Sequence, residues 1–287
     1  MSYRKTHVKS RINRSKTKES VLRKGWFWIT VLCVLVIGLV GYFVLFYSGV
    51  QVKSVEILGN KKVSTEDIED VVAINVKKEF FSFAGLSLPS SSIFLVNKEK
   101  IVHQLLDKYP TIEEVAIDKK LFSSLLLNIL EREPVAVFCP TNINNGDNPC
   151  YFMDNTGVVF EPLAEAEDNK IIVRQDMDKT TISAGKKVIE HSTMDLLLKL
   201  EKSMRDNFGI KITEATITSP IKLSVTTEEK WKIYFNLGAS SDANQELAKL
   251  ELLLKGGISD QERENLRYID LKPKDRAIVC DNSECDR

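Results

Sequence analysis

The sequence predicts an α+β protein that is anchored by a single N-terminal transmembrane helix. Three observations lead to this fold class. An uncharged apolar run covers residues 26–47; residues 52–132 then show short strand and helix patterns in β-α-α-β-β order; and the chain after Pro134 alternates strands of period two with helices. We therefore expect a small module next to the membrane and a larger, mostly antiparallel α+β domain beyond it.

The apolar run is long enough to cross a membrane. It holds twenty-two residues and no charge, and at ~1.5 Å of rise per residue it spans roughly 33 Å, against a hydrocarbon core of ~30 Å. Trp26 and Trp28 at one end, with Tyr42 and Tyr47 towards the other, suit the two interfaces. A cleavable signal peptide is the alternative, but its apolar region is ~7–15 residues long and ends at small residues. The sequence therefore favours a retained anchor.

The flanking charges predict the orientation of this helix. Residues 1–25 carry nine Lys or Arg and one acid, Glu19, whereas the whole chain carries 40 of each sign. A positive flank stays in the cytoplasm, which places residues 48–287 outside. The tail is too charged to form a core and is predicted to be disordered. Its basic residues can bind anionic lipid or nucleic acid. The orientation of the membrane helix already accounts for these basic residues, so we expect no nucleic-acid partner.

The first module is predicted to cover residues 48–133. A strand at 52–58 ends at Gly59–Asn60, and the segment Ser64–Asp67 resembles a capping box that begins a helix. Asn97 can cap a second helix that carries Ile101, Val102, Leu105 and Leu106 on one face. Strands are expected near 112–118 and 124–132. Residues 75–92 are apolar without a clean period, and we expect an extended loop there.

The second domain is predicted to cover residues 134–280, with a tail at 281–287. Pro134 cannot donate to a sheet ladder, so the chain leaves the first sheet there. Helices are expected at 194–208 and 242–255. The expected strands are 135–138, 150–153, 158–160, 212–218, 221–226, 231–237, 266–271 and 276–280. Alternation puts Ile221, Leu223, Val225, Trp231, Ile233, Phe235 and Leu237 on one buried face.

Four cysteines lie in the part predicted to be outside the cell, where disulfides persist. Their spacing suits the pairs Cys139–Cys150 and Cys280–Cys285, although four cysteines allow three connectivities. A zinc site is the other interpretation, but neither spacing is C-x₂-C and no histidine lies near. We therefore expect disulfides and no metal.

No motif predicts catalysis. His103 and His191 have no metal-binding spacing, and the sequence contains neither a G-x-S-x-G elbow nor a phosphate-binding glycine loop. A Ser–Lys dyad has no diagnostic spacing and stays open. We expect no catalytic residue, no cofactor and no small-molecule substrate.

The order of these parts resembles a known family. The segments VKSVEILGN (52–60), SIFLV (92–96), YPTIEEVAI (109–117) and LNILEREPVAV (127–137) look like a POTRA module. With YFMDNTGVVF (151–160), WKIYFNL (231–237) and YIDL (268–271), the chain resembles the FtsQ/DivIB family of bacterial cell-division proteins. Residues 121–124 (LFSS) stand where that family usually has a proline, and residues 75–92 look like an insertion.

The resemblance implies a non-enzymatic scaffold of the divisome at the division septum of the cell membrane. Such proteins hold single-span division proteins of the FtsL and FtsB/DivIC types and help control septal peptidoglycan synthesis. Two alternatives remain: an exported, membrane-anchored cell-wall hydrolase, and a POTRA-containing scaffold of another envelope assembly.

The resemblance also implies that a partner segment pairs with the last strand. The expected binding residues are Tyr268, Leu271, Lys274, Arg276, Ala277, Ile278 and Val279. The competing interpretation is an ordinary edge strand protected by Lys272, Lys274 and Arg276. A proline at Ile278 is expected to remove one ladder donor and weaken binding while sparing the core.

Overall fold

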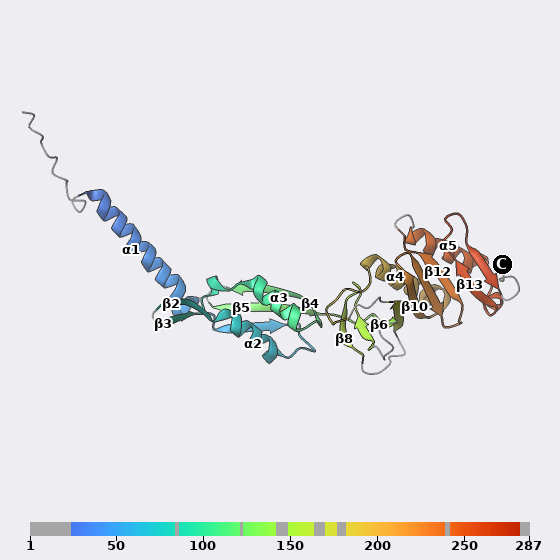
Figure 1. Cartoon of the computed structure of the whole chain (residues 1–287), viewed down its shortest axis with the longest axis horizontal. Helices are drawn as coiled ribbons and strands as arrows, with labels where there is room; N and C mark the ends of the chain where they lie inside the picture. The colour runs from blue at the N-terminus through green and yellow to red at the C-terminus, as the bar shows by residue number, and fades with distance from the viewer. Residues whose placement is uncertain are drawn as a thin grey trace, which may run out of the picture. The chain divides into compact units, whose positions relative to one another are not determined.

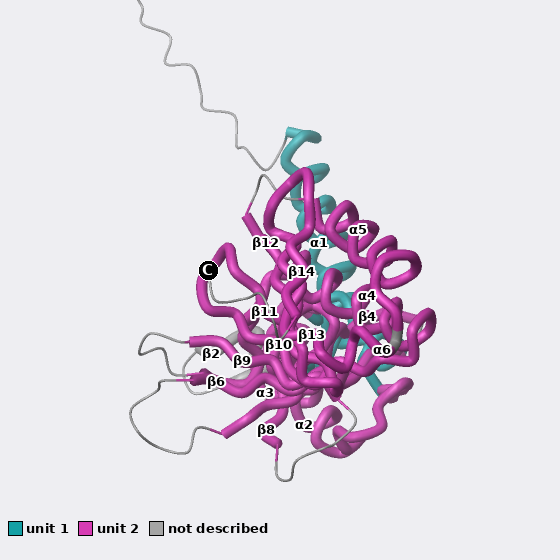
Figure 2. The backbone as a smooth tube through the Cα atoms, turned by 90° about the vertical axis from the view of Figure 1, so that its right-hand side faces the viewer, with its two compact units in different colours: residues 1–53, 76–96, 121–123 teal, residues 54–75, 97–120, 124–287 magenta. Residues whose placement is uncertain are grey.

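The structure is a computed structural model, and it describes residues 24–83, 86–120, 123–141, 149–163, 170–176, 182–238 and 242–281. The chain divides into two compact units, which Figure 2 distinguishes by colour. Unit 1 comprises residues 1–53, 76–96 and 121–123, and unit 2 comprises residues 54–75, 97–120 and 124–287.

Unit 1 is built on the helix α1, Gly25–Phe46, followed by the short 3₁₀ helix η2, Ser48–Val50. Among the described residues, α1 is the helix that is long and apolar enough to cross a membrane. None of its side chains is buried by the protein, and Trp26 is 75% exposed. Because an apolar helix needs an apolar environment on every side, this exposure agrees with a single-pass membrane anchor.

The C-terminal end of α1 is capped by side chains from two other segments. The carbonyl of Leu45 accepts hydrogen bonds from the Gln51 amide and the Ser90 hydroxyl, each at 2.7 Å. The carbonyl of Val44 accepts from the Ser92 hydroxyl, also at 2.7 Å. The last carbonyls of a helix have no partner within the helix, so these donors satisfy groups that are otherwise unpaired. The backbone of residues 90–92 is thereby fixed against the helix end.

The expected loop at 75–92 is wrong: this segment forms a β-hairpin. Strands β2, Lys78–Phe83, and β3, Leu86–Ser90, pair antiparallel with a bulge near Glu79–Phe81. Leucine and serine alternate through residues 86–88, so a weak strand signal was present. The bulge obscured the period of two in β2. A short 3₁₀ helix, η3, follows at Ile93–Leu95.

The first sheet of unit 2 has three strands in the order β1-β5-β4 (Figure 1). These are β1 Ser54–Leu58, β5 Ser124–Glu131 and β4 Ile112–Lys120; β1 is parallel and β4 antiparallel to β5. Helices α2, Thr65–Val76, and α3, Lys98–Lys108, complete the predicted β-α-α-β-β order. The fully buried side chains include Ile68, Ile101, Leu105, Leu125 and Leu127. The two helices and one face of the sheet therefore share a core.

Both predicted helix caps of this module are present. The Asn97 side chain accepts a hydrogen bond from Lys100 N at 3.1 Å, and the Ser64 hydroxyl accepts one from Asp67 N at 3.1 Å. These oxygens satisfy amide groups of the first helical turn. At the end of β5, the carboxylate of Glu131 accepts from the backbone amides of residues 61–63 and ties down the turn after β1.

The second sheet of unit 2 has nine strands in the order β14-β13-β12-β11-β10-β9-β6-β7-β8. The neighbours are antiparallel except for the parallel pairs β13–β12, β10–β9 and β9–β6. The strands are β6 Ala136–Thr141, β7 Tyr151–Met153, β8 Val159–Pro162, β9 Ile171–Asp176, β10 Ile212–Ser219, β11 Lys222–Thr227, β12 Lys232–Asn236, β13 Leu266–Asp270 and β14 Ile278–Asp281. The helices are α4 His191–Phe208, α5 Ala243–Gly256 and the short α6 Asp260–Arg263.

Helices α4 and α5 pack on one face of this sheet (Figure 1). Trp231, Phe138 and Phe235 are fully buried between sheet and helices. Gly209 ends α4 in the left-handed conformation, with φ of 69°, which a residue without a Cβ adopts at no steric cost. The other face of β10–β13 carries polar side chains at the alternate positions of each strand.

Three features of this domain differ from the sequence prediction. Strand β9 was not predicted, although it joins β6 to β10 by parallel pairing on both sides. The four-residue helix α6 was also missed, despite a capping box between Ser259 and Glu262. Ile221, expected on the buried face, is 53% exposed because it lies in the turn between β10 and β11.

Candidate partner-binding site

The last strand lies at an edge of the nine-stranded sheet. β14 pairs with β13 on one side and, among the residues that the structure describes, has no neighbouring strand on the other. An edge strand presents unpaired amide and carbonyl groups, which can template the addition of another strand. The position that the sequence suggested for a partner-binding strand is therefore topologically open.

The expected binding residues occupy different environments. Ile278 and Val279, on β14, are 41% and 43% exposed. Lys274 and Arg276 are exposed in the preceding loop and Ala277 is half-buried there. Tyr268, on β13, packs edge-on against Tyr234 at 5.5 Å between ring centroids, and Leu271 is fully buried. Tyr268 and Leu271 therefore support the edge strand from within the sheet and do not form its exposed surface.

The hydrogen-bond pattern shows which backbone groups face the open edge. Leu271 N donates to the carbonyl of Tyr234 at 3.0 Å, in register with the parallel pair Tyr234–Asp270. In a parallel ladder this directs the backbone groups of Ile269 and Leu271 towards β12, and those of Tyr268 and Asp270 towards β14.

The alternating direction of backbone groups along a strand then shows which groups of β14 face the open edge. Asp270 and Tyr268 face Ile278 and Cys280, so these two pairs exchange the hydrogen bonds of the antiparallel ladder. Val279 lies opposite Ile269 in the intervening non-hydrogen-bonded pair. The N–H and C=O groups of Val279 therefore point away from β13, towards the open edge.

The direction of these backbone groups shows that Ile278, chosen from the sequence, is the wrong position for a proline meant to disrupt partner binding. The amide of Ile278 points at Asp270 within the sheet, so a proline there breaks the pairing of β14 with its own domain. Val279 is the position at which a proline removes an outward donor and leaves that ladder intact.

A lysine that sequence reasoning did not single out holds the loop before β14. Lys249, on α5, donates from Nζ to the carbonyls of Leu271, Pro273 and Lys274 at 3.0, 2.8 and 3.4 Å. An ammonium has three donors, and here all three find carbonyl oxygens. The leucines of the α5 apolar stripe indicated its buried face, but nothing in the sequence indicated this contact. Lys249 therefore fixes the segment that leads into the edge strand.

The cysteines agree with the predicted pairing as far as the structure describes them. Cys139 and Cys150 form a disulfide with their Cα atoms 4.4 Å apart, joining a residue within β6 to the residue just before β7. Cys280 is disulfide-bonded, and its expected partner, Cys285, lies outside the described residues. Cys33, on α1, is a free thiol.

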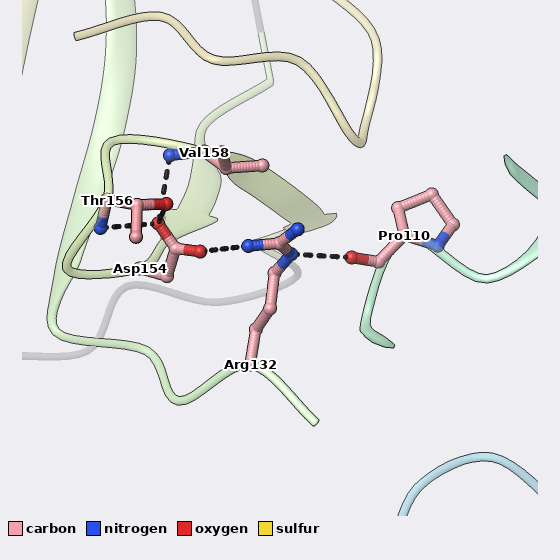
Figure 3. A network of polar contacts seen from close by, with 5 residues as sticks. All are labelled: Pro110, Arg132, Asp154, Thr156 and Val158. Carbon is pink, nitrogen blue, oxygen red and sulfur yellow. Dashed lines mark hydrogen bonds and ion pairs between the residues drawn. The ribbon is translucent and has the colours of Figure 1, made fainter. Parts of the chain in front are cut away.

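A polar network connects the two sheets of unit 2 (Figure 3). Arg132, just after β5, donates to the carbonyl of Pro110 at 3.1 Å and pairs with the carboxylate of Asp154. The other oxygen of Asp154 accepts from Thr156 N, the Thr156 hydroxyl and Val158 N at 2.7–2.9 Å. The Asp154 side chain is 1% exposed. The network therefore clamps the predicted Asp154–Gly157 turn to the end of the first module.

The pKa of Asp154 reflects this environment. Burial alone raises the pKa of a carboxyl group. The hydrogen bonds from Val158 and Thr156, together with the Arg132 guanidinium, outweigh burial and hold the pKa of Asp154 below its ordinary value. The carboxylate is therefore ionised at neutral pH.

The described residues show no cluster of metal-binding groups. No cluster of three or more His, Cys, Asp or Glu side chains suitable for a metal occurs among them. His103 and His191 are both exposed. The features that the structure brings together are an anchor, a clamped pair of sheets and an open strand edge.

Comparison with known proteins finds relatives that share one family name. No family model matches it, but curated relatives align over most of its length. A cell division protein FtsQ of Chloroflexus aurantiacus is 25% identical over 92% of this chain and 90% of its own, and a cell division protein DivIB of Clostridium botulinum is 25% identical over 79% and 81%. An FtsQ of Geotalea daltonii is 26% identical over 71% and 70%. These similarities over most of the chain support its membership of the FtsQ/DivIB family of cell division proteins.

Proposed function

We propose that this protein is a non-enzymatic scaffold of the divisome that binds a partner segment along β14. The single observation that carries the proposal is the outward direction of the Val279 backbone groups at the open edge of the sheet. The partners are single-span division proteins of the FtsL and FtsB/DivIC types, and holding them at the septum helps control peptidoglycan synthesis there.

Strand addition explains how such an edge gives affinity with little demand on partner sequence. An added strand pairs with the Val279 N–H and C=O, so main-chain hydrogen bonds supply the binding energy. Ile278 and Val279 point to opposite faces and offer apolar contact to alternate side chains of the partner. Lys274 and Arg276 keep the free edge from pairing with other copies of the chain.

The anchor sets where this edge operates. The nine bases and single acid of residues 1–25 favour a cytoplasmic N-terminus, so the two sheets lie on the outer side of the cell membrane. The Cys139–Cys150 disulfide supports that placement because disulfides persist outside the cytoplasm. Protease added to intact spheroplasts should digest residues 48–287 and leave the N-terminal tail protected.

The test of partner binding compares two substitutions at Val279 in the full-length chain. Val279→Pro removes the outward N–H, whereas Val279→Thr keeps it with a side chain of similar shape. Co-purification with an FtsB/DivIC-type partner should weaken at least tenfold, about 1.4 kcal/mol, for the proline variant only. Thermal unfolding should stay close to that of the wild type for both. Equal partner binding by the two variants would place the site elsewhere.

A further inference from the structure

A cavity lies on the face of the nine-stranded sheet that is opposite α4 and α5. Its volume is about 290 Å³, and it spans β10, β11 and β12. The residues that line it include Lys222, Lys232 and Lys272, together with Ser224, Thr216 and Tyr234. Pockets for small ligands start at roughly this size. Three ammonium groups and several hydroxyl groups around one small cavity indicate an anionic occupant.

The strand register explains why these side chains meet. Ser224 lies between Thr216 and Tyr234, its partners on the two adjacent strands. Cross-strand partners point to the same face, so the hydroxyl groups of all three residues stand on the face that α4 and α5 leave uncovered. Lys222 and Thr226 share that face by alternation, and Lys232 is the partner of Thr226.

The lysines that line the cavity differ in whether they form an ion pair with an acidic side chain. Lys272 pairs with Asp270 at 3.2 Å and lies 5.3 Å from the centre of the Tyr234 ring. Glu214, which also lies on this face, pairs with Arg174 at 3.1 Å. Within the described part of the chain, Lys222 and Lys232 make no ion pair. Two positive charges therefore face the cavity without an acid to balance them.

The placement of these two lysines defines the size of the ligand. Lys232 lies opposite Thr226, which is four residues along β11 from Lys222, so the two backbones are separated by roughly 13 Å along the strand. Each ammonium stands on a flexible four-carbon stem and reaches towards the polar floor at Ser224. A ligand with anionic groups at both ends fits between them.

We propose that this cavity binds a small anion that carries at least two phosphate or carboxylate groups, with Lys222 and Lys232 each contacting one end. Ser224 offers its hydroxyl group to the part of the ligand between the two ends, whereas the Thr216 hydroxyl donates to the Glu214 carboxylate at 3.1 Å. Lysine contacts anions as a point charge, without the fixed fork of arginine, so the site accepts both phosphate and carboxylate. This site is distinct from the β14 edge and does not depend on the partner proposal.

The test titrates the full-length chain, in a non-ionic detergent at fixed ionic strength, with tripolyphosphate and with citrate. Isothermal calorimetry should show saturable one-to-one binding of at least one of them, and their relative affinities distinguish phosphate from carboxylate recognition. The double variant Lys222→Gln, Lys232→Gln should weaken that binding at least tenfold. The control Lys100→Gln, Lys202→Gln removes the same charge from exposed positions on α3 and α4 and should bind like the wild type.

A third variant separates a built site from general attraction to positive charge. Ser224→Ala leaves the charge unchanged and should weaken binding about threefold by removing one hydroxyl donor. Val279→Pro should leave anion binding unaltered. The proposal is overturned if neither anion binds saturably, or if the two lysine double variants weaken binding equally.

Discussion

Asp154→Ala tests how strongly the network at the junction of the two sheets holds unit 2 together. The substitution removes the acceptor for Thr156 N and Val158 N and leaves Arg132, whose side chain is 14% exposed, without its carboxylate. Each lost backbone hydrogen bond costs about 1 kcal/mol, and a hydrogen bond to a charged group costs about 1.5–3 kcal/mol. Because Thr156 and Val158 are only half-buried and water can replace part of the loss, we expect about 3 kcal/mol.

Differential scanning calorimetry of the full-length chain in detergent measures this effect. For a unit of this size, about 3 kcal/mol corresponds to a fall in Tm of roughly 6–12 °C. Glu161→Gln is the matched control. It breaks the exposed Lys62–Glu161 ion pair (2.6 Å) near the same junction, and exposed pairs contribute less than about 1 kcal/mol. The reasoning is refuted if Asp154→Ala lowers Tm no more than the control.

The remaining predictions concern pH, the disulfide and the loop before β14. Because the pKa of Asp154 is lowered in the fold, its ionised form stabilises the protein above about pH 4, and this stabilisation is lost as pH falls through the folded-state pKa. The Tm difference between wild type and Asp154→Asn should therefore narrow below about pH 4. A Tm difference that stays constant with pH would show that ionisation of Asp154 does not stabilise the fold. Replacing Cys139 and Cys150 together by serine should cost roughly 2.5–3 kcal/mol, since their sequence separation is 11; reductant should lower the Tm of the wild type towards that of the variant, and no effect in either would contradict this. Lys249→Met should speed amide exchange in residues 271–281, while Lys255→Met, at an exposed position of α5, should not; equal exchange in the two would show that Lys249 does not hold the loop.

Local sequence signals predicted the elements that short-range chemistry determines. Asn97 and Ser64 begin helices because their side chains cap the first turn, and the alternation of Leu223, Val225, Ile233 and Phe235 placed two strands correctly. The position of the last strand at an edge followed from the order of elements. The β2–β3 hairpin and β9 were missed because a bulge hides the period of the first, and because three consecutive apolar residues at 171–173 give the second no alternation.

Contacts between residues far apart in the chain could not be predicted from the sequence. The boundary at residues 133–134 was drawn at a proline, and whether 48–133 and 134–280 fold independently stays a prediction. Both sheets fall within one compact unit. Arg132 and Lys62 connect them through Asp154 and Glu161, contacts that no local pattern encodes. In the same way, the family resemblance indicated the last strand, but the outward residue, Val279, emerged only from the hydrogen-bond register with β13.

Amide hydrogen exchange at single-residue resolution along β14 tests the central claim most directly. In the free full-length chain the Val279 amide should exchange fast, whereas the amides of Ile278 and Cys280 should be protected by their pairing with β13. Addition of an FtsB/DivIC-type partner should slow exchange at Val279 strongly and change Ile278 and Cys280 little. If Val279 is already protected in the free chain, or stays unprotected in a chain saturated with partner, β14 is not the strand to which the partner adds.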